Sequence, residues 1–542
     1  MATSGDQSDL QDLPLEGDDS VVQKMHQRGV VWTIWFTYGA FYFCRTNISA
    51  AAAALSMAPE AGGLGLNRYQ VGWILAALKI SYALGQLING QLAERIRPRV
   101  LLAIGMFGSA ALNVIFGLGT GFYFLLFVWA CNGYCQSLGW TPCVRVVGNW
   151  IPPSWRGKAI GIIGTGYQIT LGLTYVLASY SVEWFGWRGA VFIPAIVLAV
   201  AGIAMLLLLR EMPEQELSAA GSQSLPAAAA NSWMENMFLT LFNPTLWILG
   251  MALGLLNACR YGFMDWGLTH LLEVQESSIG KAGLKYCVIA IGAVAGSYLA
   301  GVATDRLFGG RRAPVIFVLL IMLSAMTLLY ESVSRTSATG TVLLLIVIGF
   351  CIYGPQVLLV GTAPVDLAHK GTAAAAAGFV NFMGYMGAAT GDVVTGYFSV
   401  EAHGGWQTAI YIWAGWALGA ALMTTLLWNA TSSKMRLLPA WLPRVLAAAG
   451  LLAGAGLLQL ADGPTWLLVT SVIAALLLLT ARGKLRPLAG LAGLLGLLGL
   501  ICLLFKLGLE LADDAPSWYR LAPTAAHGFS LLATVMVLID RR

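Results

Sequence analysis

Charged residues are scarce in this chain. Of its 542 residues, 31 are Lys or Arg and 26 are Asp or Glu, so the charged fraction is 11%, against about 25% in a soluble globular protein. The hydrophobic fraction is 58%. So few charges cannot cover a compact soluble fold, because the excess apolar side chains need a non-aqueous solvent. The composition excludes a disordered chain, an ordinary soluble enzyme and a nucleic-acid-binding protein with a basic face, and it predicts an integral membrane protein.

Motifs for metals, nucleotides and secretion are also missing. None of the eight cysteines has a CxxC or Cys/His spacing that suits zinc, and no GxxxxGK[ST] phosphate loop occurs. Residues 1–27 are polar and acidic and lack the basic region and the cleavage site of a signal peptide, so they are interpreted as a cytoplasmic tail. We therefore expect no cofactor, no metal and no enzymatic activity.

Long apolar segments dominate the rest of the chain. A bilayer core of about 30 Å needs about 20 apolar residues per helix. Two groups of six such segments are predicted, near 30–50, 70–92, 99–118, 121–142, 159–181 and 187–209, and near 243–265, 281–303, 313–331, 340–362, 372–397 and 406–428. The sequence thus predicts an all-α membrane protein with two six-helix halves (28–209 and 243–430), a cytoplasmic linker (210–242) and about four extra transmembrane helices in 431–542.

The distribution of basic residues predicts the orientation. Lys and Arg concentrate in alternate short loops, and the other loops hold mostly acids. Because basic loops stay in the cytoplasm, both termini are expected there, in a multi-pass protein of the plasma (inner) membrane.

The two groups of six resemble each other. Arg45 in the first helix matches Arg260 in the seventh, and Trp187 matches Trp406, at nearly constant spacing. Two parallel six-helix halves are typical of a transporter that rocks around a site at the membrane midplane. A Gly-x-x-x-[Asp/Glu]-Arg loop also repeats, and its charged residues are predicted to gate the cavity by ion pairing, although they also set topology: Glu94, Arg95, Asp305 and Arg306.

Four charged residues stand out as candidates at membrane depth, Arg45, Lys79, Arg260 and Asp392, and each is a functional hypothesis because a charge there is costly. Arg45 and Arg260 are expected to meet at the central cavity, where two planar guanidiniums suit a phosphate dianion. The alternative is that each arginine extends to an interface. Lys79 shares a helix face with Tyr82 and Gln86, and lies either at the substrate or nearer the outer interface.

Asp392 is the one acid that we place near the midplane, where it would partner an arginine or lysine when substrate is absent. Three cations and one acid would leave two net positive charges, which a phosphate dianion would neutralise. This balance depends on the assignment of those four residues.

Several motifs make the chain similar to a known family, the organophosphate:inorganic phosphate antiporters of the major facilitator superfamily, which include glycerol-phosphate and hexose-phosphate carriers. The motifs lie within residues 28–430 and are specific in combination: Tyr38-x3-Tyr42-x2-Arg45-x-Asn47, Gly139-Trp140-x-Pro142-Cys143-x-Arg145, Trp155-Arg156-Gly157, Arg260-Tyr261-Gly262-x2-Asp265-Trp266, Tyr353-Gly354-Pro355 and Gly384-Tyr385-x-Gly387. The resemblance implies the major facilitator fold for the two halves. Residues beyond about 433 lie outside it.

The resemblance also implies the site. Arg45 and Arg260 would be the phosphate-binding arginines, and five tyrosines would surround the pocket: Tyr38, Tyr42, Tyr82, Tyr353 and Tyr385. Gln86, Tyr167 and Ala290 replace a lysine, a histidine and a glutamate of the glycerol-phosphate carrier, which argues against glycerol phosphate itself. Lys79 would supply the missing positive charge at another depth.

The sequence therefore predicts exchange of a phosphorylated small organic anion for inorganic phosphate. The protein is expected to contact the lipid bilayer and not to bind nucleic acid. The competing hypothesis is a transporter-like membrane sensor of sugar phosphates, in which the C-terminal extension docks a protein of a signalling complex. A proton-coupled drug exporter ranks last, because it needs acids at the midplane.

Overall fold

The computed structural model describes residues 17–211, 239–308, 312–367 and 373–427. The predicted extra module, 431–542, and most of the predicted linker lie outside the described residues. The chain divides into two compact units, and the first comprises Met1–Ala227, Ile248–Pro364 and Ala377–Asn429. In the second unit, the Asn243 amide donates a hydrogen bond of 3.1 Å to the Leu367 carbonyl. The site described below lies within the first unit.

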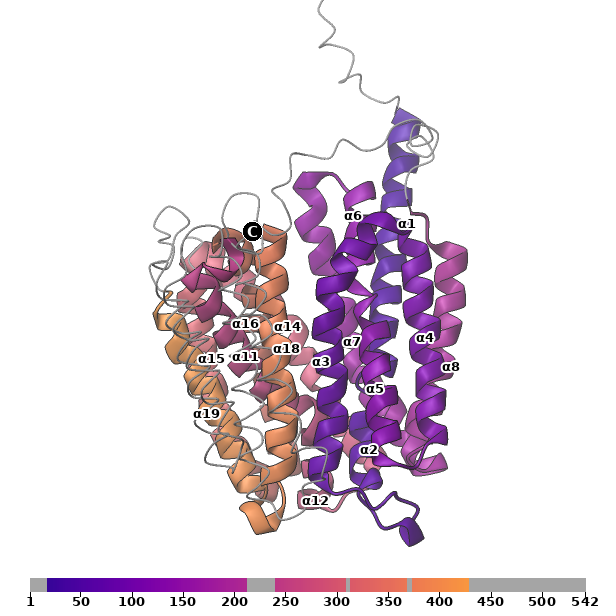
Figure 1. The fold of residues 1–542 in the computed structure, drawn as a ribbon. Coiled ribbons are helices and arrows are strands. Elements are labelled where there is room, and N and C mark those ends of the chain that lie inside the picture. The colour runs from indigo at the N-terminus through magenta and orange to yellow at the C-terminus, as the bar shows by residue number, and fades with distance from the viewer. Residues whose placement is uncertain (1–16, 212–238, 309–311, 368–372, 428–542) are drawn as a thin grey trace, which may run out of the picture. The chain divides into compact units, whose positions relative to one another are not determined.

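The N-terminal half is helical throughout (Figure 1), with these elements: α1 (Gly17–Ala40), η1 (Phe41–Cys44), α2 (Ile48–Leu55), η2 (Pro59–Ala61), α3 (Arg68–Arg95), α4 (Pro98–Leu118), α5 (Phe122–Ser137), α6 (Trp140–Trp150), α7 (Pro153–Phe185) and α8 (Gly189–Leu208). Local chemistry sets several boundaries. Asn67 and Gln70 form a capping box that starts α3. Gly186, with φ of 68°, ends α7, because that conformation suits only glycine well.

Two features of this half differ from the sequence prediction. The helix α1 begins at Gly17, inside the segment interpreted as a tail, and the predicted first span, 30–50, is divided by the 3-10 helix η1. The predicted fourth span, 121–142, is likewise divided between α5 and α6. Apolar periodicity does not locate such breaks, since the side chains on either side remain equally hydrophobic.

The C-terminal half contains these elements: α11 (Pro244–Tyr261), η3 (Gly262–Trp266), α12 (Gly267–Gln275), α13 (Ile279–Tyr286), α14 (Ile289–Leu307), α15 (Arg312–Thr336), α16 (Ala338–Val357), η4 (Leu358–Thr362), α17 (Ala363–Leu367), α18 (Ala373–Phe398), η5 (Glu401–His403) and α19 (Gly405–Thr425). The elements η3 and η4 are π-helical. Such π-bulges occur frequently at functional sites, because one extra residue per turn shifts the direction of the side chains that follow.

Helices are the only regular elements within the described residues, and seven of them are long and apolar enough to cross a membrane: Pro98–Leu118, Trp155–Phe185, Gly189–Leu208, Pro244–Gln275, Ile279–Arg306, Arg312–Thr336 and Ala338–Gly361. Exposed apolar side chains such as Leu207 (79% exposed) and Phe127 (69%) are consistent with a lipid-facing surface. The prediction of an all-helical, multi-pass membrane protein is confirmed.

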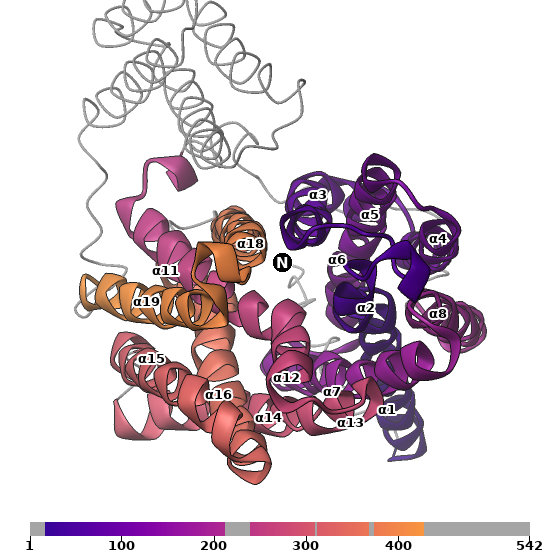
Figure 2. The ribbon, with the colours of Figure 1, turned by 90° about the horizontal axis from the view of Figure 1, so that it is seen from below.

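The two halves form two bundles that meet along α3, α7, α13, α14 and α18 (Figure 2). Glycines permit the close approach of α3 and α18: a Cβ atom on Gly72 would lie 2.8 Å from the Asp392 carbonyl, and one on Gly396 would lie 2.5 Å from the Arg68 carbonyl. At the start of α3, the Arg68 guanidinium forms an ion pair with Glu273 and donates a 2.7 Å hydrogen bond to the Ser399 carbonyl. Both residues belong to the other half.

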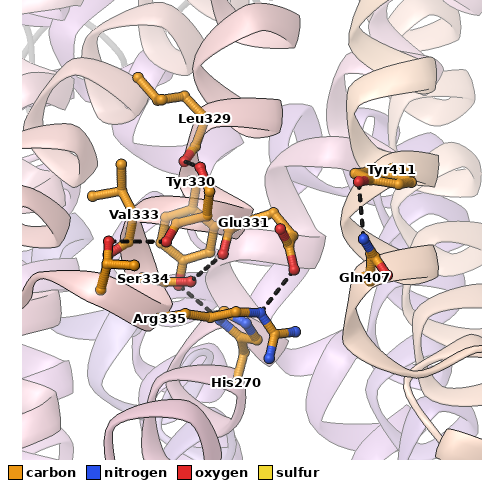
Figure 3. Close-up of polar contacts among 11 residues, drawn as sticks. His270, Leu329, Tyr330, Glu331, Val333, Ser334, Arg335, Gln407 and Tyr411 are labelled. Atoms are coloured by element: carbon orange, nitrogen blue, oxygen red, sulfur yellow. Dashed lines mark hydrogen bonds and ion pairs between the residues drawn. The ribbon is translucent and has the colours of Figure 1, made fainter.

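Polar contacts hold α12 beside α15 (Figure 3). The buried His270 Nδ1 lies 3.0 Å from the Tyr330 hydroxyl, and on the same helix as Tyr330 the Arg335 Nε donates a 2.8 Å hydrogen bond to Glu331 Oε1. The imidazole also packs edge-on against Trp406 of α19, with ring centroids 5.1 Å apart. Because α12 follows η3 directly, these contacts also position the π-helix and its acidic residue, Asp265.

Candidate functional site

Arg45 lies at the break between η1 and α2 and is 4% exposed. Its Nε donates a 3.0 Å hydrogen bond to Gln136 Oε1, and its Nη2 donates a 3.4 Å bond to the Gln136 carbonyl. The Gln136 amide is itself fixed, because it donates to the Phe41 carbonyl and to Ser109 Oγ at 3.0 and 2.8 Å. Within the described residues, Arg45 Nη1 has no hydrogen-bond partner. One edge of the guanidinium is thus held by the protein and another is free for a ligand.

Arg260 is the penultimate residue of α11, which the π-helix η3 follows, and is 2% exposed. Its Nη2 donates a hydrogen bond of 3.4 Å to the Tyr353 hydroxyl, whereas its Nε has no hydrogen-bond partner among the residues that the structure describes. Arg260 is therefore also buried and incompletely satisfied. Buried polar groups without partners are uncommon in folded proteins and require an explanation, such as a ligand.

Tyrosine rings cover both guanidiniums. The Arg45 Cζ lies 4.6 Å from the ring centroids of both Tyr42 and Tyr82. The Arg260 Cζ lies 4.9 Å from the centroid of Tyr261 and 4.8 Å from that of Tyr353. These distances are in the range of cation–π attraction, which stabilises a cation without neutralising its charge.

The same rings connect the two arginines across the halves. On one side, Tyr82 of α3 lies 4.5 Å from Tyr385 of α18, which is 6.3 Å from Tyr261. On the other side, Tyr42 stacks on Tyr167 of α7 at 5.0 Å, and Tyr167 is 6.4 Å from Tyr353. The result is a closed ring of two arginines and six tyrosines, which we call the tyrosine ring, with three tyrosines from each half: Tyr42, Tyr82 and Tyr167, and Tyr261, Tyr353 and Tyr385.

A second charged cluster joins the halves beside the tyrosine ring. The Lys79 ammonium of α3 forms ion pairs with two carboxylates of the other half, Asp265 of η3 and Asp392 of α18, the latter at 2.5 Å. All three side chains are 4% exposed or less. The Lys79 Nζ is also 4.8 Å from the centroid of Tyr261, the tyrosine that contacts Arg260. We call these three residues the acid–lysine cluster.

The cluster corrects two sequence expectations. Asp392 is not the one acid in the interior, because Asp265 is equally buried and reaches the same lysine. Among the described residues, three buried cations (Arg45, Lys79 and Arg260) and two buried carboxylates (Asp265 and Asp392) give an interior charge of +1, in place of the expected +2. Lys79 is also not a free positive charge, because both acids contact its ammonium. Only folding could show this pairing, since Lys79 is far from both acids in the chain.

The other predicted substrate residues lie at different distances from the arginines. Tyr38 packs beside the tyrosine ring, with its centroid 6.0 Å from Tyr167 and 4.9 Å from Trp140. Gln86 is half-buried and donates a 3.4 Å hydrogen bond to the Ser137 carbonyl of α5. The described contacts therefore bring Tyr38 to the ring and direct Gln86 to a neighbouring helix.

The predicted gating residues lie at the far ends of α3 and α14. Arg95, Asp305 and Arg306 are exposed, and within the described residues they form no ion pair. The side chain of Glu94 is not among the described ones. Gating by these four residues remains a prediction.

Sequence analysis missed three residues of this site as candidates: Gln136, Tyr261 and Asp265. Tyr261 and Asp265 belong to the motif that begins at Arg260, and each could have been found as a polar group inside a predicted span. The π-helix is the reason that spacing alone did not place Asp265, because an α-helical projection gives the wrong direction for residues after Tyr261.

Comparison with known proteins agrees with the fold. The sequence profile of the Major Facilitator Superfamily matches residues 34–392, so the chain belongs to this superfamily of transporters and is not an enzyme. A solved structure of the same fold, a bacterial homolog of the human lysosomal transporter Spinster in an inward-facing and occupied conformation, has a TM-score of 0.59 at 16% identity and covers 79% of this chain and 100% of its own.

Several curated proteins are similar to the chain over most of its length. The probable hexose phosphate transport protein of Chlamydia muridarum is 29% identical over 77% of this chain and 95% of its own length. The glycerol-3-phosphate transporter of Bacillus subtilis is 28% identical over 76% and 95%. The membrane sensor protein UhpC of Escherichia coli is 28% identical over 70% and 88%. The chain is a member of the superfamily that is similar to the organophosphate:phosphate antiporters, as its motifs predicted.

Proposed function

We propose that this protein exchanges a phosphorylated small organic anion, such as a sugar phosphate, for inorganic phosphate by alternating access. The observation that carries the proposal is the pair of buried guanidiniums, Arg45 and Arg260, one from each half and each with an unpartnered nitrogen among the described residues. A phosphate group offers several acceptor oxygens to such planar donors. Because both ligands carry phosphate, one site serves both and no ATP is required.

Electrostatics supports a ligand that is an anion. Burying a charge without a counter-ion is costly, and the arginines contact neutral phenols, since the two interior acids are engaged by Lys79. Binding of a phosphate group neutralises the guanidiniums and so favours closure of the two halves. The phenol hydroxyls of the tyrosine ring could bond the organic part, because each can donate and accept hydrogen bonds.

The membrane placement follows from the same proposal. An exchanger of phosphorylated metabolites would lie in the plasma (inner) membrane, with both termini in the cytoplasm as the positive loops indicate. The relatives named as hexose phosphate and glycerol-3-phosphate transporters indicate the class of the organic substrate. The substitution of Gln86 and Tyr167 for ionisable residues favours a sugar phosphate over glycerol phosphate.

Exchange of radiolabelled phosphate in proteoliposomes tests the proposal. Proteoliposomes that contain the full chain and are loaded with unlabelled phosphate are expected to take up external labelled phosphate. Sugar phosphates are expected to compete with that uptake. Arg45→Lys and Arg260→Lys keep the charge but lose the planar, multi-donor geometry, so each is expected to reduce exchange by at least about 10-fold.

A matched control separates geometry from general damage. Arg28→Lys makes the same change on an exposed side chain of α1 and is expected to leave exchange unchanged. Wild-type exchange rates in Arg45→Lys or Arg260→Lys would contradict the two-arginine site. Absence of exchange in the wild-type protein would contradict the proposed function.

A sensor of sugar phosphates is the second candidate, favoured by the similarity to the membrane sensor protein UhpC. A sensor would keep the two arginines and bind the same anions, and residues 431–542 would then supply a docking site for a protein partner. Binding of a sugar phosphate without turnover in the same proteoliposomes would support the sensor. Robust exchange would support the carrier.

A further inference from the structure

The acid–lysine cluster contains one acid more than its lysine can neutralise. The Lys79 ammonium contacts Asp265 and Asp392, so the cluster carries one net negative charge in an interior where water is scarce. Because both carboxylates contact one nitrogen atom, they lie within about 5 Å of each other, a distance at which like charges interact strongly. One additional proton would make the cluster neutral.

The two acids are not equivalent. Asp265 accepts a hydrogen bond from Lys79. Asp392 is completely buried, and its Oδ2 lies 2.5 Å from Lys79 Nζ, whereas its Oδ1 has no hydrogen-bond partner within the described residues. A buried carboxylate with an unpartnered oxygen gains more from a proton than a fully paired one, because the neutral acid needs less solvation.

The cluster also spans the seam between the halves. Lys79 belongs to α3 of the N-terminal half, and both acids belong to the C-terminal half. In the proposed alternating access, a phase in which α3 moves away from the C-terminal half would break both ion pairs. The C-terminal half would then hold two adjacent carboxylates without their ammonium, and a proton on one of them reduces this cost.

No other titratable group around the acids supplies a positive charge in direct contact with them, among the contacts that the structure describes. The other groups are the phenols Tyr82 of α3, Tyr175 of α7, Tyr261 of α11, Tyr286 of α13, Tyr353 of α16 and Tyr385 of α18, together with Arg260, which contacts Tyr261 and Tyr353. In the described contacts, Lys79 is the cation that touches the carboxylates.

From this geometry we propose that the acid–lysine cluster is a proton-binding site, with Asp392 as the group that takes up the proton when Lys79 leaves. The proton comes from water on the open side, binds a carboxylate oxygen to form the neutral acid, and returns to water when the ion pair with Lys79 forms again. The proposal rests on the proposed phosphate exchange and goes beyond it, since it makes the movement of the halves depend on pH.

Equilibrium exchange of radiolabelled inorganic phosphate, at equal pH on both sides of the proteoliposome, tests the proposal. Wild-type protein is compared with Asp392→Asn, which imitates the protonated acid, and with Glu60→Gln, which removes an exposed acid of η2. The ionisation of phosphate itself affects all three proteins alike, so the ratio of variant to wild-type rates isolates the cluster.

The ratio of the Asp392→Asn exchange rate to the wild-type rate is expected to rise about 10-fold between about pH 6 and about pH 8. The wild-type rate falls at higher pH because Asp392 must bind a proton in each cycle, whereas the Asp392→Asn variant needs none. The ratio for Glu60→Gln is expected to stay constant. A constant ratio for Asp392→Asn, or a well-folded Asp392→Asn protein that is inactive at every pH, would overturn the proton site.

If Asp392→Asn does not fold, Asp392→Glu keeps the acid on a longer side chain and is expected to shift the pH at which exchange is half-maximal. An unchanged pH profile in that variant would overturn the proposal. No exchange in the wild-type protein at any pH would overturn the proposed function as well, so the two failures are distinguishable.

Discussion

Removal of the Lys79 ammonium is the sharpest test of how the interior charges are balanced. Lys79→Met keeps most of the side-chain volume but leaves Asp265 and Asp392 buried beside each other without a cation. Breaking a buried ion pair by removing one partner costs about 3–5 kcal/mol, because the remaining charge is uncompensated. At an effective dielectric constant of about 20, the attraction of one close pair is about 4 kcal/mol, which is consistent with that range.

The assay is thermal unfolding of the purified protein in detergent, followed by tryptophan fluorescence. Lys79→Met is expected to lower the unfolding free energy by about 3–5 kcal/mol, and the triple variant Lys79→Met/Asp265→Asn/Asp392→Asn is expected to recover most of the loss, because no charge then remains in the cluster. A single variant within about 0.5 kcal/mol of wild type would refute the reasoning, as would a triple variant no more stable than the single one.

Two further predictions concern the surroundings of the site. Gln136→Leu removes the acceptor of the hydrogen bond from Arg45 Nε. The apparent affinity for phosphate in the exchange assay is expected to fall about 10-fold, because a hydrogen bond to a charged group contributes about 1.5–3 kcal/mol. An unchanged KM for phosphate would contradict the positioning role of Gln136. Gly387→Ala would place a Cβ atom 2.2 Å from the Gly254 carbonyl, so α11 and α18 would have to move apart. The free energy of unfolding is expected to fall by at least about 1–3 kcal/mol in the thermal assay. Gly378→Ala, on the same helix and with no atom within 4 Å of the added Cβ, is expected to lower it less. Equal stability of these two glycine variants would contradict the tight packing.

The pairing of the charges is the part of the site that the sequence could not supply. Arg45 and Arg260 were recognisable because each lies in an apolar span at the same place in its half, and charges at that depth are rare. The two acidic partners of Lys79 were not recognisable as its partners. Helix periodicity shows which residues share one face of a helix, but not which other helix that face contacts. The π-helix η3 adds to the difficulty, since it redirects Asp265 after Tyr261.

Some helix boundaries could likewise be predicted from the sequence, and others could not. Periodic apolar segments located α4, α8 and α15 closely, because burial in lipid demands an unbroken run of apolar residues. The break at η1, which presents Arg45 to the interior, left no comparable signal, since the residues Phe41–Cys44 are as apolar as the helix before them. Such breaks are stabilised by tertiary contacts, here the hydrogen bonds of Gln136 to Phe41 and Arg45.

Scarcity of charge was enough to indicate a membrane protein and to single out its two arginines, because the free energy of placing charges in lipid constrains composition directly. The closed ring of six tyrosines and the sharing of Lys79 between two acids depend instead on contacts between helices that are distant in the chain. Those contacts changed the interior balance from two net positive charges to one, since a charge count requires every buried partner to be known. The number of acids at the seam, and with it the proposed dependence on protons, follows from three-dimensional packing alone.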